Sequence, residues 1–178
     1  MAHNTVRTGY QELVERLNRF PQGAPPSELL FRILAMMFSE REASLVARLP
    51  IKPFSAEQAA RAWKLPVAEA QPVLDELAGR AILLDIEVDG SRSYVLPPPM
   101  AGFFEFSMMR VRGDIDQKLL AELFYEYLNV EEEFIRALFT NGETQLGRVF
   151  VSEPSLPADG ALVVLDHERA SQVVAEAA

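Results

Sequence analysis

Three consecutive glutamates, Glu131 to Glu133, form the densest group of side chains that could act as acids, bases or ligands for a hard cation. They directly precede an apolar helical pattern at residues 134–139. Carboxylates in the first turn of a helix are stabilised by the helix dipole, each by about 0.3–1 kcal/mol. We therefore interpret the three glutamates as helix-capping residues rather than as a catalytic or metal site.

Nucleophiles and soft metal ligands are scarce. The chain has two histidines, His3 and His167, and no cysteine. Ser171 follows His167 by four residues, which puts both on one helix face, but this spacing supplies neither an orienting group nor an oxyanion site. Without cysteine the chain cannot form a disulfide or hold a thiolate-ligated zinc or iron–sulfur centre. The sequence therefore predicts no catalytic constellation and no cofactor bound by the chain itself.

Four polar side chains could contact DNA, two on one predicted helix, residues 67–80, one just before it and one on the hairpin that follows. They are Lys64, Gln71, Arg80 and Arg92. DNA-reading helices carry such residues toward base edges and phosphates. The same helix also carries Glu69, Asp75 and Glu76, which would face phosphate at a cost. We therefore do not expect nucleic acid as a partner, and a winged-helix DNA-binding transcriptional regulator is the alternative function.

Large apolar side chains crowd residues 103–109, just after the prolines at 97–99. They are Phe103, Phe104, Phe106, Met108 and Met109. Such a group could stack on a cofactor, but aromatic residues at this density usually form core. We predict that they pack at a junction between two domains.

The N-terminal residues 1–26 are predicted to form an arm and a linker. Apolar side chains recur at helical spacing between residues 5 and 20, and prolines and a glycine follow at 21–26. Because this helix is amphipathic and precedes a stiff linker, we expect it to dock onto a partner or to form a homodimer.

Residues 27–99 are predicted to form a winged helix-turn-helix module. Ser27 is a good N-cap, and Ser39 and Ser55 each begin a capping box. Asp89 and Gly90 mark a tight hairpin turn between strands expected at 82–88 and 93–96. Three helices followed by a hairpin are typical of a winged helix.

Residues 100–178 are predicted to form an acidic docking domain with a helical hairpin and two strands. Asp114 and Asn129 are expected to cap the two helices, and strands are expected at 146–152 and 161–165 before a last helix capped by Asp166. Residues 1–100 carry 11 basic and 12 acidic residues, net −1, whereas residues 101–178 carry 6 and 14, net −8. The predicted fold class is therefore α+β and mainly α, with the acidic half suited to a basic protein partner.

The composition is that of a globular protein, with 49% hydrophobic and 24% charged residues among 178. The longest apolar run, residues 29–38, is interrupted by Arg32 and is too short to cross a bilayer. No apolar signal core follows Met1. These features predict a cytoplasmic protein without a membrane span.

Four stretches, in their order along the chain, resemble a family of bacterial and archaeal ferredoxin-like 4Fe-4S iron–sulfur proteins with an N-terminal winged-helix segment. They are LVARLP at 45–50, YVLPPP at 94–99, GFFEF at 102–106 and VVLDHERA at 163–170. The resemblance covers most of residues 27–178, and none of these stretches is a catalytic signature. In that family, cysteine motifs that ligate 4Fe-4S clusters follow the part that resembles this chain.

The resemblance implies a non-catalytic N-terminal region of an electron-transfer protein, with the clusters in a C-terminal part beyond these residues. No position of this chain can inherit a cluster ligand, because the family's functional residues are cysteines. We expect this region to bind a redox partner or an assembly protein. The resemblance also implies that the full-length protein belongs to an oxidoreductase system.

Overall fold

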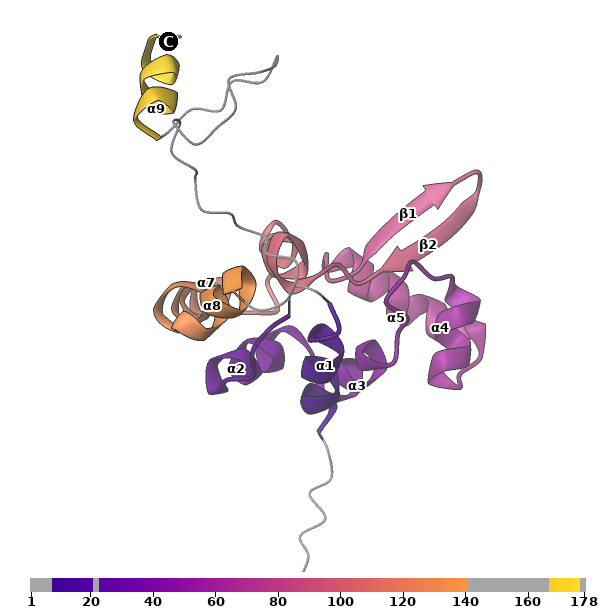
Figure 1. Ribbon diagram of the computed structural model, residues 1–178. Helices are drawn as coiled ribbons and strands as arrows, with labels where there is room; N and C mark the ends of the chain where they lie inside the picture. Colours follow the sequence, from indigo (N-terminus) through magenta and orange to yellow (C-terminus); the bar gives the residue numbers. More distant parts are fainter. Residues whose placement is uncertain (1–7, 21–22, 141–166, 177–178) are drawn as a thin grey trace, which may run out of the picture. The chain divides into compact units, whose positions relative to one another are not determined.

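The computed structural model describes residues 8–20, 23–140 and 167–176. The chain divides into two compact units, residues 1–144 and residues 145–178. The described part is mainly helical and contains one two-stranded antiparallel sheet (Figure 1). This confirms the predicted mainly α composition with a minor β component.

The first three helices are α1 (Gly9–Leu17), α2 (Glu28–Met37) and α3 (Glu40–Ala47). Each begins where a side-chain oxygen accepts a hydrogen bond from a backbone amide of the first turn, namely at Thr8, Ser27 and Ser39. The first helix is shorter than the predicted span of 5–20, because it starts at the Thr8 cap and its last turn is closed at Asn18.

Helix α1 packs on α3, and its apolar face is buried within the chain. Leu13 and Leu17 have no exposed surface, and Val14 is 6% exposed. Gly9 permits close contact, since a Cβ there would lie 2.9 Å from the Ser44 backbone nitrogen. The face predicted to dock or dimerise is thus occupied internally, and dimerisation through it would require this packing to open.

A buried cation joins α1 to the end of α3. Arg16 is 1% exposed, and its Nε and Nη2 donate to the carbonyls of Leu49 and Pro50 at 3.1 and 2.7 Å. Burial lowers the pKa of the Arg16 guanidinium to about 10, so it is still charged at neutral pH. These bonds satisfy carbonyls just after the C-terminus of α3, where a cation is favoured by the helix dipole.

Helices α4 (Ala56–Trp63) and α5 (Val67–Gly79) precede a hairpin of β1 (Leu84–Val88) and β2 (Ser91–Val95). The Ser55 capping box forms with Gln58 as predicted. Pro72 lies in the interior of α5. Asp89 and Gly90 both have positive φ, 51° and 73°, which is the geometry of a tight two-residue hairpin turn. Phe54 forms an isolated antiparallel bridge with Tyr94, on the other edge of β2 from β1.

An irregular turn, Pro99–Phe103, leads into α6 (Phe104–Met108) and α7 (Gln117–Tyr125). The predicted cap at Asp114 is wrong: Asp116 accepts from the Leu119 amide at 3.0 Å, whereas Asp114 binds Arg112.

A π-helical turn, Glu126–Val130, connects α7 to α8 (Glu132–Thr140). The predicted cap at Asn129 is also wrong, because Asn129 lies within this turn and donates to the Tyr125 carbonyl.

The second unit contributes α9 (His167–Glu176) to the described residues. The strands predicted at 146–152 and 161–165, and the cap predicted at Asp166, lie outside them.

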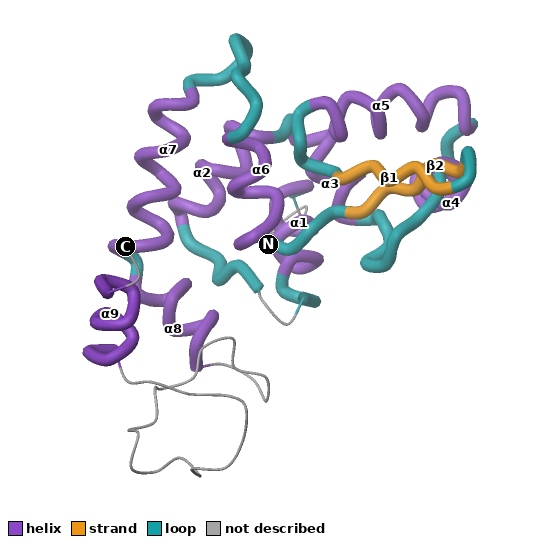
Figure 2. Tube along the Cα trace, turned by 90° about the horizontal axis from the view of Figure 1, so that it is seen from above, coloured by secondary structure: helices purple, strands orange, loops and turns teal. Residues whose placement is uncertain are grey.

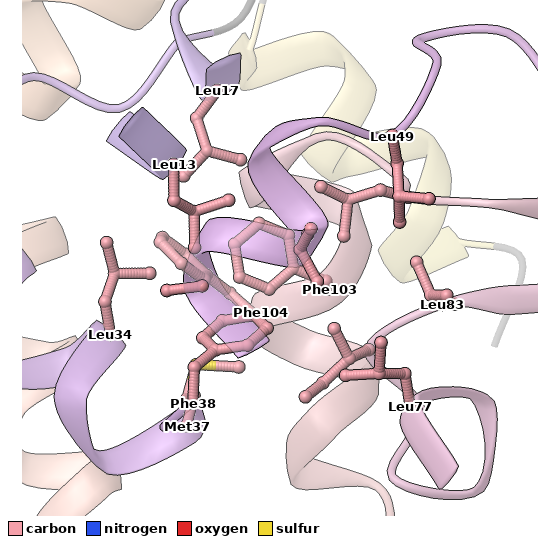
Figure 3. Close-up of a cluster of buried hydrophobic side chains, with 14 of the residues drawn as sticks. Leu13, Leu17, Leu34, Met37, Phe38, Leu49, Leu77, Leu83, Phe103 and Phe104 are labelled. Carbon is pink, nitrogen blue, oxygen red and sulfur yellow. The ribbon is translucent and has the colours of Figure 1, made fainter. Parts of the chain in front are cut away.

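A single apolar core runs through the described part of the first unit. Figure 3 shows Phe103 and Phe104 at the centre of this cluster, near leucines of α1 and α5. The Phe103 ring contacts Phe38 and Phe104, with centroids 6.4 and 4.7 Å apart, and Phe104 contacts Phe124 at 4.8 Å. The core is therefore continuous across the prolines at 97–99, from residues of α1 and α2 to residues of α7.

The predicted junction side chains separate into two groups. Phe103 and Phe104 are fully or almost fully buried, at 0% and 2% exposed. Phe103 makes the aromatic contact between the two predicted domains, with Phe38, whereas the ring contacts of Phe104 are with Phe103, Phe124 and Tyr127 of its own predicted domain. Phe106 and Met108 are half-buried, and Met109 is 75% exposed.

Candidate protein-docking surface

The hairpin lies alongside α5, as Figure 2 shows, and polar contacts of Tyr94 and Arg92 hold its orientation. The Tyr94 hydroxyl donates to Asp75 Oδ1 of α5 at 2.7 Å, and Gln71 Nε2 donates to the same oxygen at 2.9 Å. Burial, together with the hydrogen bond to Asp75, raises the pKa of Tyr94. The neutral phenol is therefore the form that joins β2 to α5.

Arg92 strengthens this contact between hairpin and helix. Its Nη1 lies 3.1 Å from Asp75 Oδ1, and its Nε donates to Asp85 Oδ2 of β1 at 3.0 Å. The hydrogen bond to Asp85 is the main reason why the pKa of Arg92 is raised. Because cross-strand partners share a face, the pairs Asp85–Tyr94 and Glu87–Arg92 both lie on the face that is turned toward α5.

The opposite face of the hairpin is apolar and exposed. Leu84, Ile86 and Val88 are 36%, 48% and 61% exposed, and they alternate along β1. Their cross-strand partners on this face are Val95, Ser93 and Ser91. A strand covering a core normally turns its apolar side chains inward and its charges outward. Here the arrangement is reversed, and we call these three side chains the outer face of the hairpin.

The hairpin and the helix beside it are acidic. Between residues 64 and 95 the chain has three basic residues and six acidic ones, a net charge of −3. The acidic ones, Glu69, Asp75, Glu76, Asp85, Glu87 and Asp89, are all exposed. An apolar strip on an acidic part of the chain is suited to a protein partner that is apolar and basic.

The side chains predicted to contact DNA do not form a basic face. Gln71 binds Asp75 and Tyr94, and Arg92 binds Asp75 and Asp85. Arg80 is turned toward the first helices, where it pairs with Glu42 of α3 and reaches the Met37 carbonyl of α2. Lys64, exposed at the C-terminus of α4, lies apart from these contacts.

The three glutamates belong to the first unit, and His167 and Ser171 belong to the second. Glu132 and Glu133 lie in the first turn of α8, while Glu131 ends the preceding turn. His167 and Ser171 lie on α9 in the other unit. Across the described ranges, no three histidine or carboxylate side chains are placed to hold a metal ion, and the chain has no cysteine. These residues therefore do not fit an iron–sulfur cluster.

Two open concavities lie beside α1, each of about 330–360 Å³. One is lined mainly by apolar surface from residues including Val14, Pro26 and Phe31, and the other by polar surface including Glu12 and Arg48. Neither includes a residue of the hairpin. Among the helices that are described, none is long and apolar enough to cross a bilayer.

Sequence reasoning missed the outer face, although the signal was present. The alternation of Leu84, Ile86 and Val88 with Asp85 and Glu87 indicates a two-faced strand but not which face is covered. The hairpin register places Tyr94 on the same face as Asp85. A large aromatic side chain on the charged face indicates that this face is the covered one.

Comparison of the chain with family models, with curated protein sequences and with solved structures finds no match.

Proposed function

We propose that this chain is a non-catalytic docking region of an iron–sulfur electron-transfer protein, and that residues 27–99 form a winged-helix module whose wing binds a protein partner. The order α3, Phe54 bridge, α4, α5 and hairpin supports a winged helix. In that arrangement Phe54 is a minimal first strand beside β2, and β1 and β2 are the wing.

The observation that carries the docking role is the orientation of the wing. Tyr94 and Arg92 face α5, so Leu84, Ile86 and Val88 face away from it. Each of these side chains would gain stabilisation from burial, at roughly 25 cal/mol per Å² of apolar surface removed from water. An apolar strip of this kind is typical of protein–protein contacts rather than of phosphate contacts.

Charge argues against DNA as the ligand of this module. The exposed face of α5 includes Glu69, Asp75 and Glu76, where a DNA reader would present basic or amide side chains. Arg92, on the wing, is already paired with two carboxylates. A duplex approaching this face would meet net negative charge and lose affinity accordingly.

The iron–sulfur assignment depends on the sequence stretches at 45–50, 94–99, 102–106 and 163–170. Clusters would be held by cysteines outside these 178 residues. The iron–sulfur assignment is tested by sequencing the open reading frame that encodes the chain. Cys-x-x-Cys motifs are expected downstream of codon 178, and a stop codon directly after it would contradict the assignment.

Site-specific photocrosslinking tests the docking role. A photoreactive amino acid replaces Ile86 in the full polypeptide, and Met109, which is also exposed and apolar, is replaced in the matched control. We expect position 86 to crosslink to one protein segment that contains both apolar and basic residues, and we expect Val88→Glu to suppress the product. Crosslinks to nucleic acid, or equal products from positions 86 and 109, would contradict the proposal.

A further inference from the structure

Resting on the docking role above, we propose that the partner supplies an extended segment of alternating apolar and basic residues, which pairs with the free edge of β1 as an added strand. The proposal depends on three properties of β1: outward backbone groups, an exposed apolar side and an acidic side.

The backbone groups of Asp85 point away from the hairpin. Tyr94, opposite Asp85, exchanges both of its backbone hydrogen bonds with Phe54, at 2.8 and 2.9 Å. In an antiparallel pair, a residue that bonds outward is opposite another residue that also points outward. The amide and carbonyl of Asp85 therefore lie on the outer edge of β1.

The backbone amide and carbonyl of Glu87 also point away from the hairpin. Glu87 is opposite Arg92 and two residues from Asp85, so it falls in the same class of antiparallel pair. Leu84, Ile86 and Val88 direct their backbone groups toward β2 instead. The outer edge thus offers two amides and two carbonyls, alternating as a pairing strand requires.

The described residues leave this edge open. In the described ranges, β1 pairs with β2 and with no other strand. All five residues of β1 are exposed. Open edges that carry apolar side chains tend to recruit another strand, and Asp85 and Glu87 are the kind of charges that restrict which strand can be accepted.

A second copy of this chain is a poor occupant. If two β1 strands paired antiparallel about Ile86, Asp85 of one copy would lie opposite Glu87 of the other at two positions. Like charges directly opposite each other destabilise a pair of strands. A basic segment would replace both repulsions with attractions. Of the two acidic side chains in β1, Asp85 already forms an ion pair with Arg92, so Glu87 is the one we expect to pair with the partner.

The side chains of the added strand follow from the period of two. Residues beside Leu84, Ile86 and Val88 would be apolar, because they extend the outer face. Residues between them would share the face of Asp85 and Glu87 and would be lysine or arginine.

The test uses the full 178-residue chain, labelled with ¹⁵N, and a synthetic peptide of alternating valine and lysine. The controls are a peptide of equal composition with its valines and lysines in two blocks, and an alternating peptide with N-methyl groups along one edge. We expect the alternating peptide to protect the amides of Asp85 and Glu87 from hydrogen exchange. The block peptide and the N-methylated peptide are expected to bind at least about tenfold more weakly.

Two protein variants complement the peptides. Glu87→Pro and Glu87→Ala remove the same charge, but only proline also removes the outward amide, and edge positions tolerate proline. We expect Glu87→Pro to weaken peptide binding at least about tenfold more than Glu87→Ala. Because N-methylation alters the peptide alone, that comparison holds even if Glu87→Pro unfolds the hairpin.

Each result distinguishes strand addition from docking in general. Equal binding of the alternating and N-methylated peptides, with loss of both in Ile86→Glu, would overturn strand addition and leave the docking role intact. Absence of any peptide effect at the hairpin, together with no specific crosslink from position 86, would overturn both.

Discussion

The Tyr94 hydroxyl lies 2.7 Å from the Asp75 carboxylate, and this bond, together with the Arg92–Asp75 ion pair, holds one face of the hairpin toward α5. The tyrosine ring also stacks with Phe54, with centroids 6.3 Å apart. Position 94 therefore links the hairpin to α5 and to the segment before α4, while the apolar side chains of β1 remain in solvent.

Removing this hydroxyl should loosen the hairpin without emptying the core. We expect Tyr94→Phe to lower the free energy of unfolding by about 1–2 kcal/mol, because Asp75 loses a donor that is partly shielded from water. Urea unfolding measures the change. Tyr125→Phe is the matched control, since Tyr125 is 64% exposed, and it should change stability by less than about 0.5 kcal/mol. Equal effects of the two variants would contradict the role of the Tyr94 bond.

The same bond predicts a loss of stability at alkaline pH. Because burial raises the pKa of Tyr94 in the folded chain, its stabilisation is complete below the unfolded value of about 10 and is lost as pH rises through the higher folded value. Tyr127 shifts in the same direction for the same main reason. Unfolding free energies measured above pH 10 should therefore fall less steeply for Tyr94→Phe than for the native chain. Parallel slopes would argue against a buried neutral phenol.

Arg16 should be important for stability despite being charged. Arg16→Met leaves the Leu49 and Pro50 carbonyls without their donor, and we expect a loss of about 2–3 kcal/mol, as is usual for hydrogen bonds to a charged group. Chemical unfolding of Arg19→Met, at an exposed position of the same segment, provides the comparison. If Arg16→Met were as mild as Arg19→Met, the buried guanidinium would not be holding α1 against α3.

Two glycines should respond to alanine in opposite ways. At Gly9 the added Cβ would press against the Glu40 carbonyl oxygen and lie 2.9 Å from the Ser44 nitrogen, so α1 and α3 must separate. We expect Gly9→Ala to cost about 1–3 kcal/mol. At Gly79 nothing lies within 4 Å of the added Cβ, and alanine should be neutral or stabilising by up to about 1 kcal/mol. Thermal unfolding of both variants tests whether the two helices are in backbone contact.

The aromatic segment after the prolines should contain one essential ring and one dispensable side chain. Phe104 is 2% exposed and contacts Phe103 and Phe124, so Phe104→Ala should cost about 3–5 kcal/mol. Met109→Ala, at a side chain that is 75% exposed, should change stability by less than about 0.5 kcal/mol. Calorimetry on both variants would contradict the continuous core if the two losses were similar.

Local chemistry made much of the helical fold predictable. The capping boxes at Ser39 and Ser55 and the Asp89–Gly90 turn depend on residues within three positions of one another, and the structure confirms all three. The choice between Asp114 and Asp116 as a cap was less determined, because both stand just before the apolar pattern. Pairing of Asp114 with Arg112 leaves Asp116 as the cap of α7.

Long-range contacts explain what the sequence did not reveal. A charged residue such as Arg16 in an amphipathic helix is expected to be exposed. Its burial depends on hydrogen bonds to the Leu49 and Pro50 carbonyls, 33 and 34 residues away. The exposure of the candidate docking surface also depends on long-range contacts. Alternation along β1 defines two faces, and the contacts of Tyr94 and Arg92 with Asp75, 19 and 17 residues apart, show which of them is free.

The most direct test of the docking role measures the affinity of the crosslinked partner segment for three proteins: the native chain, Ile86→Asn and Met109→Asn. The unfolding free energy of each of these proteins is measured as well. We predict at least about tenfold weaker binding for Ile86→Asn with a stability change under about 0.5 kcal/mol, and unchanged binding for Met109→Asn. Native-like binding by Ile86→Asn would contradict the claim that the outer face of the hairpin is the docking surface.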